Sequence, residues 1–190
     1  MAAFELEVDG AEGWVLIRTD LAGRKLVKDL RNQMPGQHRG TAQLLAGLAR
    51  DVIARDVAAG APPLLGMWAR IDDPKAAAPA AVARLHMMPV EKDATVQSYA
   101  ADLLLGSVLR EPFELTAVET ASGEAHHLSA VLDLGADHVG SRLHRTDMIF
   151  WLRPADEEAM VLSVQTTDLA RAATLGPELR RLAAGVRWGR

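Results

Sequence analysis

Cysteine is absent from the 190 residues of the chain. Its absence excludes disulfide bonds and thiolate nucleophiles, and it leaves only histidine and carboxylate side chains as ligands for a zinc ion. Aromatic residues are scarce at 4%, whereas 49% of the residues are hydrophobic and 24% are charged. This composition is typical of a globular protein with a mostly aliphatic core. The length predicts a single domain that spans residues 1–190.

A surplus of basic residues is missing as well, because the formal net charge is -4 at pH 7. Nucleic-acid binding depends on cationic side chains, so we expect no nucleic-acid partner. No run reaches the roughly 18 apolar residues of a membrane span, and the N-terminal segment MAAFELEVDGAEGW lacks the basic start of a signal peptide. We therefore predict a cytoplasmic protein with no membrane partner.

Apolar residues recur at helical spacing in four segments, 22–36, 41–60, 94–112 and 174–188. Thr41 is the expected N-cap of the second helix, and Pro112 should end the third. Pro177 fits the first turn of the fourth helix. The first segment also carries basic residues, which are expected to form a solvated helix face; these are Arg24, Lys25, Lys28 and Arg31.

Strand-like patterns occupy most of the remaining chain. We expect a hairpin over residues 4–20, a second over 64–88 and a meander of strands over 113–167. In DMIFWL, residues 147–152, both alternating sets of side chains are apolar, so this strand should be covered on both faces. Short loops join consecutive strands, which favours a mainly antiparallel sheet. The predicted fold is a three-layer α/β/α sandwich of the α+β class.

This order of elements, with EGWVLIRTD at residues 12–20 and LAAGVRW at residues 182–188, resembles the PsbP-like superfamily. That superfamily includes a subunit of the photosynthetic oxygen-evolving complex and the Ran-binding nuclear import factor. Some bacterial members act as chaperones or adaptors for secreted effectors. The chain is most similar to an alanine-rich actinobacterial branch. The resemblance implies a PsbP-like, non-enzymatic fold that binds other proteins, and it implies no catalytic residues.

The segment from residue 124 to 151 contains several histidines, namely His126, His127, His138 and His144. Neighbouring residues of a strand point to opposite faces, so His126 and His127 cannot bind one ion together. No short spacing on a regular element fixes three ligands, as a zinc site without cysteine requires. We therefore predict no metal site and no cofactor, and we expect metal ions not to stabilise the fold.

Motifs of known reaction classes are also missing, including the phosphate-binding glycine loops, H-E-x-x-H and G-x-S-x-G. We therefore predict that the protein is not an enzyme and has no catalytic residues. The leading hypothesis is a cytoplasmic protein-binding module that acts as an adaptor or a chaperone-like protein. A secretion-associated role is one option for such a module. The alternative is a small-ligand-binding domain or a hydrolase with a pocket between sheet and helices.

The segment from Leu103 to Leu109 is expected to be helical and has apolar side chains on more sides than one sheet face can cover. We expect a partner to cover the apolar side chains that the sheet leaves exposed, and a second copy of the chain, which would form a homodimer, is one option. The alternative within the chain is that the N-terminal segment covers them. The expected interface also includes the terminal helix. The candidate interface residues are Leu104, Leu105, Leu109, Leu179, Val186 and Trp188.

Overall fold

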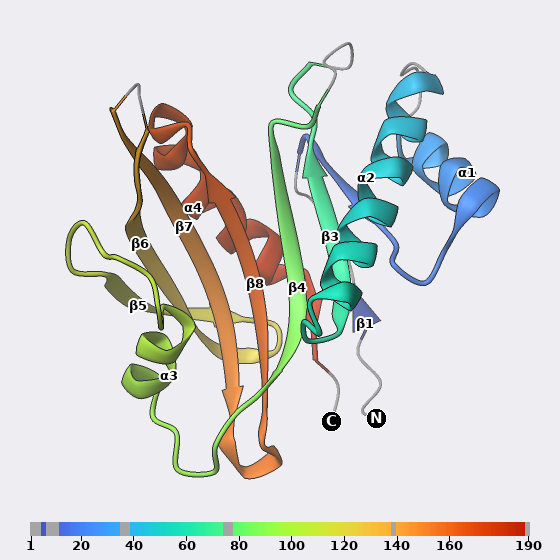
Figure 1. Cartoon of the computed structure of the whole chain (residues 1–190). Coiled ribbons are helices and arrows are strands. Elements are labelled where there is room, and N and C mark those ends of the chain that lie inside the picture. Colours follow the sequence, from blue (N-terminus) through green and yellow to red (C-terminus); the bar gives the residue numbers. More distant parts are fainter. Residues whose placement is uncertain (1–4, 7–11, 35–38, 74–77, 138–139, 189–190) are drawn as a thin grey trace. The chain divides into compact units, whose positions relative to one another are not determined.

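A computed structural model describes residues 5–6, 12–34, 39–73, 78–137 and 140–188 (Figure 1). The chain divides into two compact units. The N-terminal unit is residues 11–87, and the C-terminal unit is residues 88–190 together with residues 1–10. The expected α+β class with antiparallel strand pairing is confirmed. Whether residues 1–190 act as a single domain stays a prediction.

The N-terminal unit contains two helices and its own antiparallel strands. Its elements are β2 (Trp14–Ile17), α1 (Gly23–Gln33), α2 (Arg39–Ala58), β3 (Leu64–Arg70) and β4 (Ala81–Pro89). Strand β3 pairs with β2 on one side and with β4 on the other, so the predicted hairpin over 64–88 is confirmed. Helix α2 begins before Thr41, which lies inside the first turn with 9% exposure, so the prediction that Thr41 is the N-cap is wrong.

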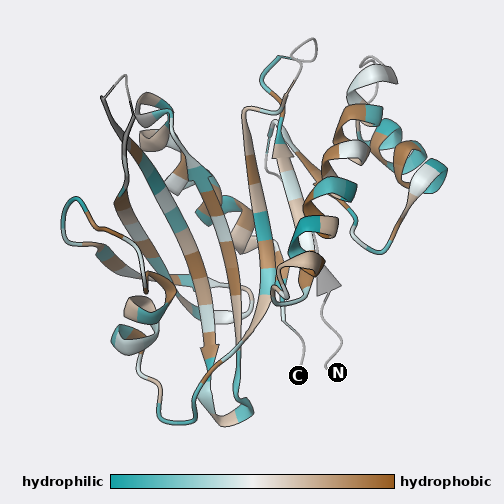
Figure 2. Ribbon diagram, in the orientation of Figure 1, coloured by the Kyte–Doolittle hydropathy of each residue, from teal (hydrophilic) through white to brown (hydrophobic). Residues whose placement is uncertain are grey.

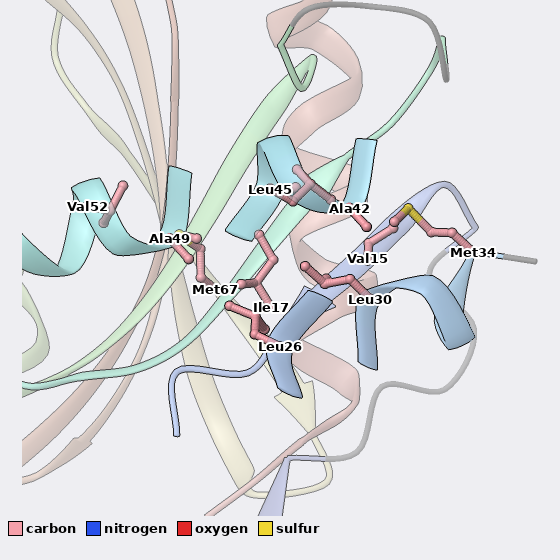
Figure 3. Packing of buried hydrophobic residues seen from close by; sticks show 11 residues of the cluster. Val15, Ile17, Leu26, Leu30, Met34, Ala42, Leu45, Ala49, Val52 and Met67 are labelled. Carbon is pink, nitrogen blue, oxygen red and sulfur yellow. The ribbon is translucent and has the colours of Figure 1, made fainter. Parts of the chain in front are cut away.

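Both helices of the N-terminal unit pack on the strands β2 and β3 (Figure 3). Helix α1 buries one stripe of side chains at spacings of four, which is Leu26, Leu30 and Met34. Helix α2 buries Leu45 and Ala49 in the same cluster, where they meet side chains of β2 and β3 such as Ile17 and Met67. Figure 2 shows hydrophobic and hydrophilic residues side by side along both helices. Each helix is therefore amphipathic: one face packs on the strands, and its other faces are not covered by them.

The C-terminal unit is built on a meander of long antiparallel strands. Its elements are β1 (Glu5–Leu6), α3 (Val96–Leu103), β5 (Glu114–Thr120), β6 (Gly123–Asp137), β7 (Gly140–Arg153), the 3-10 turn η1 (Pro154–Asp156), β8 (Glu158–Thr166), α4 (Leu169–Ala184) and β9 (Val186–Arg187). Its strands lie in the order β8-β7-β6-β5, as the predicted meander requires.

Strand β7 is buried on both of its faces. Ile149, Phe150 and Trp151 are at most 2% exposed, although consecutive side chains point in opposite directions. Phe150 makes an edge contact with Tyr99 of α3, with ring centroids 5.3 Å apart. The indole Nε1 of Trp151 donates to Thr120 Oγ1 at 2.8 Å. The expectation that this strand is covered on both faces is confirmed, whereas the three-layer arrangement of the chain stays a prediction.

Three expectations about element boundaries are wrong. The first is the N-terminal hairpin over 4–20, because β1 pairs with β9 and β2 pairs with β3. The second is the helix over 94–112, because α3 ends at Leu103. Gly106 has φ +79°, a left-handed conformation that ends a helix. The following residues instead bridge to β6 through Leu109 and Leu132.

The third wrong boundary is the start of the terminal helix. Helix α4 begins at Leu169, because the carboxylate of Asp168 accepts hydrogen bonds from the backbone of Ala170 and Arg171. Pro177 therefore lies inside the helix and not in its first turn. Within the described ranges, no helix combines the length and apolar character needed to cross a bilayer.

Candidate protein-binding groove

A groove of about 1080 Å³ lies between α1 and α2 of the N-terminal unit. It forms because both helices bury one face against β2 and β3 and leave adjoining faces uncovered. Apolar side chains form its floor; among them are Leu26, Val27, Ala46, Ala49 and Ile53. The volume lies at the upper end of the roughly 300–1,000 Å³ that is usual for a ligand pocket.

Positive charge lines the edge of the groove. Arg24, Lys28 and Arg31 follow one stripe of α1, and Arg50 lies across the groove on α2. No residue that lines the groove is acidic. Within the described part of the chain, Arg24, Lys28 and Arg31 have no ion-pair partner, whereas Arg50 contacts Asp51 at 3.2 Å. The groove therefore combines an apolar floor with a basic edge, and the α1 cations of this edge have no ion-pair partner among the described residues.

Gly47 leaves the α2 side of the groove open. A methyl group added at Gly47 would meet no atom within 4 Å. Ala46, the lining residue next to Gly47, also has a small side chain. Small residues let another backbone approach a helix closely, so the floor can accept a bulky group from outside.

A smaller pocket of about 240 Å³ adjoins the groove and shares Thr19 and Ile53 with it. Asp20 and Asp56 line this pocket, so the basic lining stops here. Arg18 donates a hydrogen bond to the carboxylate of Asp20 at 2.8 Å, and this bond lowers the pKa of Asp20. Asp56 lies 3.9 Å from Arg84, and its second oxygen has no hydrogen-bond partner among the described residues.

The C-terminal unit holds a polar cluster in which His127 and Asp147 are buried, Arg145 is half-buried and Arg180 is exposed. His127 of β6 and Asp147 of β7 are 6% and 1% exposed. His127 Nε2 lies 3.1 Å from Asp147 Oδ1, and Arg180 of α4 lies 3.0 Å from His127 Nδ1. Arg145 donates to Asp147 at 3.0 and 3.3 Å. The cluster therefore ties α4 to the strands beneath it.

The hydrogen bonds indicate which ring nitrogen of His127 donates and which accepts. Arginine can only donate, so Nδ1 of His127 accepts from Arg180, and Nε2 carries the proton that is donated to Asp147. Burial of Asp147 opposes its ionisation, but the bonds from His127 and Arg145 outweigh burial and hold the pKa of Asp147 below its ordinary value. Because both ring nitrogens are engaged, His127 has none left to take a proton from a nucleophile. The cluster is suited to holding α4 in place.

Of the other histidines considered as metal ligands, His126 and His144 lie in different surroundings. His126 lies against the ring of Phe150 and 3.3 Å from Glu124. Burial lowers the pKa of His144, whose Nε2 has no hydrogen-bond partner among the described residues. His138 lies outside the described residues. In the part of the chain that the structure describes, no three His, Asp or Glu side chains gather as metal ligands.

The predicted interface residues divide into buried and exposed ones. Four are in the interior: Leu104, Leu179, Val186 and Trp188 are 5%, 0%, 1% and 5% exposed. Arg153 lies 3.8 Å over the ring of Trp188 and bonds to its carbonyl, so Trp188 closes the edge of the core. As interior residues, these four offer no surface to a partner.

Leu105 and Leu109 are on the surface, with 84% and 39% exposure. Val108 beside them is 65% exposed. All three follow α3, in the segment that was expected to be helical. An interface at Leu105 and Leu109 stays a prediction.

Sequence reasoning missed the groove, because the basic residues of α1 were interpreted as a solvated face. A signal was present in the sequence. On the surface of a helix, a lysine or arginine can form an ion pair with a carboxylate three or four residues away along the chain. Neither Lys28 nor Arg31 has such a neighbour, whereas Lys25 has Asp29.

Comparison of the chain with protein-family models and with curated proteins finds no match.

Proposed function

We propose that the protein is a non-catalytic protein-binding module, adaptor or chaperone-like, and that the groove between α1 and α2 receives a segment of its partner. The observation that carries this proposal is the groove itself, with its apolar floor and a basic edge whose α1 cations have no ion-pair partner in the described part of the chain. Apolar floors with polar edges are the usual anatomy of protein interfaces. The secretion-associated role named above is one setting for such a module.

The chemistry of the lining supports binding over catalysis. Its charged side chains are all arginine or lysine, and it has no histidine or carboxylate to act as a general base. The most buried histidine and aspartate, His127 and Asp147, belong to the other unit and bind each other. Tyr99 is also unsuited to proton transfer, because burial and Asp102 raise its pKa to about 12.

The finer fold assignment belongs to the same proposal. We propose a three-layer α/β/α sandwich related to the PsbP-like superfamily. Burial on both faces of β7 supports the layering, and the order of elements supports the relationship. A cytoplasmic location completes the proposal, supported by the absence of cysteine.

A photo-crosslinking experiment tests the role of the groove. A photoreactive phenylalanine analogue replaces Ala54, an exposed residue that lines the groove, and in a second variant it replaces Arg55. Adjacent helix residues point about 100° apart, and Arg55 does not line the groove, so Arg55 is a matched control. We expect a discrete protein adduct at Ala54 that is weak at Arg55. Equal adducts at both positions, or none, would contradict the proposal.

Self-association through the exposed segment is a second candidate. Its support is the exposure of Leu105, Val108 and Leu109, since large apolar side chains clustered on a surface favour contact with another molecule. Light scattering coupled to size exclusion tests it. A dimer that becomes a monomer on Leu105→Glu supports this interface, and a monomeric wild type at micromolar concentration removes it.

A further inference from the structure

We infer that the segment bound by the groove is an acidic amphipathic helix of about three turns. This inference rests on the proposed function and names the chemistry of the partner. Three features of the groove lead to it: the sign of its charges, the helical backbone of most of its walls, and its length along α2.

The charges select an acidic partner. Arg24, Lys28 and Arg31 recur at spacings of four and three on α1, so they form one row about 10 Å long. Among the described residues no carboxylate neutralises this row. Carboxylates at the same spacings on a second helix would face all three cations. Such pairs contribute to specificity and to the rate of association more than to affinity.

The walls of the groove favour a helix over an extended segment. Apart from residues 19–22 and the first turn of α1, where Ala22 provides no side-chain cap, the lining is helical, and backbone N–H and C=O groups within a helix bond to one another. An extended peptide would find backbone partners only at that end of the groove and would leave most of its own polar groups unpaired against Leu26, Val27 and Ile53. A helix satisfies its backbone internally and needs only an apolar stripe for the floor.

The length of the lining gives the length of the partner segment. On α2 the lining extends from Gln43 to Ala54. At about 1.5 Å per residue this distance is about 16 Å, which corresponds to roughly 11 residues, or three turns. Gly47 lies within it, where a large apolar side chain of the partner has space.

Defined peptides provide the test with the full-length protein. The probe is a fluorescein-labelled amphipathic peptide of about 14 residues, with leucines on one stripe and glutamates beside it. Its control has glutamine in place of every glutamate. Fluorescence anisotropy should show the glutamate peptide binding about tenfold more tightly at low salt. The difference should shrink when the salt concentration rises from about 50 mM to about 500 mM.

Two pairs of variants locate the binding site. Lys28→Glu combined with Arg31→Glu should weaken the glutamate peptide about tenfold, whereas Lys25→Glu, on the same helix but outside the groove, should change it less than about twofold. Gly47→Leu should fill the floor and abolish binding, whereas Gly40→Leu should not. At either glycine the first added atom meets nothing within 4 Å, so both variants should fold, which circular dichroism checks.

Several outcomes would overturn the inference. They are equal binding of the two peptides, equal effects of Lys28→Glu with Arg31→Glu and of Lys25→Glu, and preferential binding of anionic phosphatidylserine vesicles or of duplex DNA. If the peptides do not bind but Ala54 still forms its specific protein adduct, the proposed function stands and the partner chemistry is wrong. If both experiments fail, the groove is not a protein-binding site.

Discussion

The same substitution, glycine to alanine, should have opposite effects at two helix positions. Gly47 in α2 has open space where a methyl group would be added. Alanine is a better helix former than glycine, so Gly47→Ala should stabilise the N-terminal unit by about 1 kcal/mol. At Gly176 in α4 the added carbon would lie 3.2 Å from both Asp147 Oδ1 and His127 Cε1.

The neighbours of Gly176 are held in place and cannot move away easily. His127 is bonded on both sides, at 3.1 Å to Asp147 and 3.0 Å to Arg180, and Arg145 holds Asp147 at 3.0 Å. Overpacking costs about 1–3 kcal/mol, and the helix gain of about 1 kcal/mol offsets only part of a cost in the upper part of that range. We therefore expect Gly176→Ala to destabilise the C-terminal unit by a net amount of up to about 2 kcal/mol.

Urea denaturation measures both effects, with circular dichroism and tryptophan fluorescence followed in parallel. Adding His127→Ser removes the ring that the methyl group would meet, so Gly176→Ala should cost less in that background. If Gly176→Ala stabilises the protein as much as Gly47→Ala does, the description of a tightly held cluster under α4 is wrong.

Three further predictions concern the core and pH. Tyr99→Phe should stabilise by about 1 kcal/mol, because its hydroxyl is buried without a partner among the described residues; a loss in urea titration would contradict this. Phe150→Ala and Trp151→Ala should each cost about 3–5 kcal/mol, and a silent variant would refute two-sided burial of β7. Burial lowers the pKa of His144, so the unfolded chain binds more protons than the folded chain does below about pH 6.5, and the free energy of unfolding should fall from pH 7 to 5. His144→Leu should weaken this dependence, and an unchanged slope of the unfolding free energy against pH would contradict the prediction.

The elements with strong periodicity could be predicted from the sequence. The helical stripe of Leu26, Leu30 and Met34 corresponds to α1, and the two apolar parities of DMIFWL correspond to the buried strand β7. These patterns are reliable because burial on one or both faces directly constrains the residues at each position.

The failures arose where long-range contacts decide the structure. Local patterning could not show that Glu5 and Leu6 pair with residues 186–187, far along the chain. The apolar run after α3 continued the helical pattern, but Gly106 ends it and backbone bonds to β6 replace it. The terminal helix was placed too late because Asp168 was not recognised as its N-cap.

The candidate site was less predictable than the fold. A groove depends on how two helices lie beside each other, which no single segment encodes. The cations on α1 were visible in the sequence, but only the structure shows that Lys28 lines the groove while Lys25 does not. The polar cluster was equally hidden, since His127 and Arg180 are separated by 53 positions.

Alanine-methyl NMR tests most directly whether the groove is the binding surface. Protein labelled with ¹³C at alanine methyl groups would be titrated with the glutamate peptide. The largest shift changes should fall on Ala46, Ala49 and Ala54, which line the groove, while Ala172 and Ala183 of α4 stay unchanged. Shift changes centred on the α4 methyl groups, or spread evenly over both units at saturating peptide, would contradict the account.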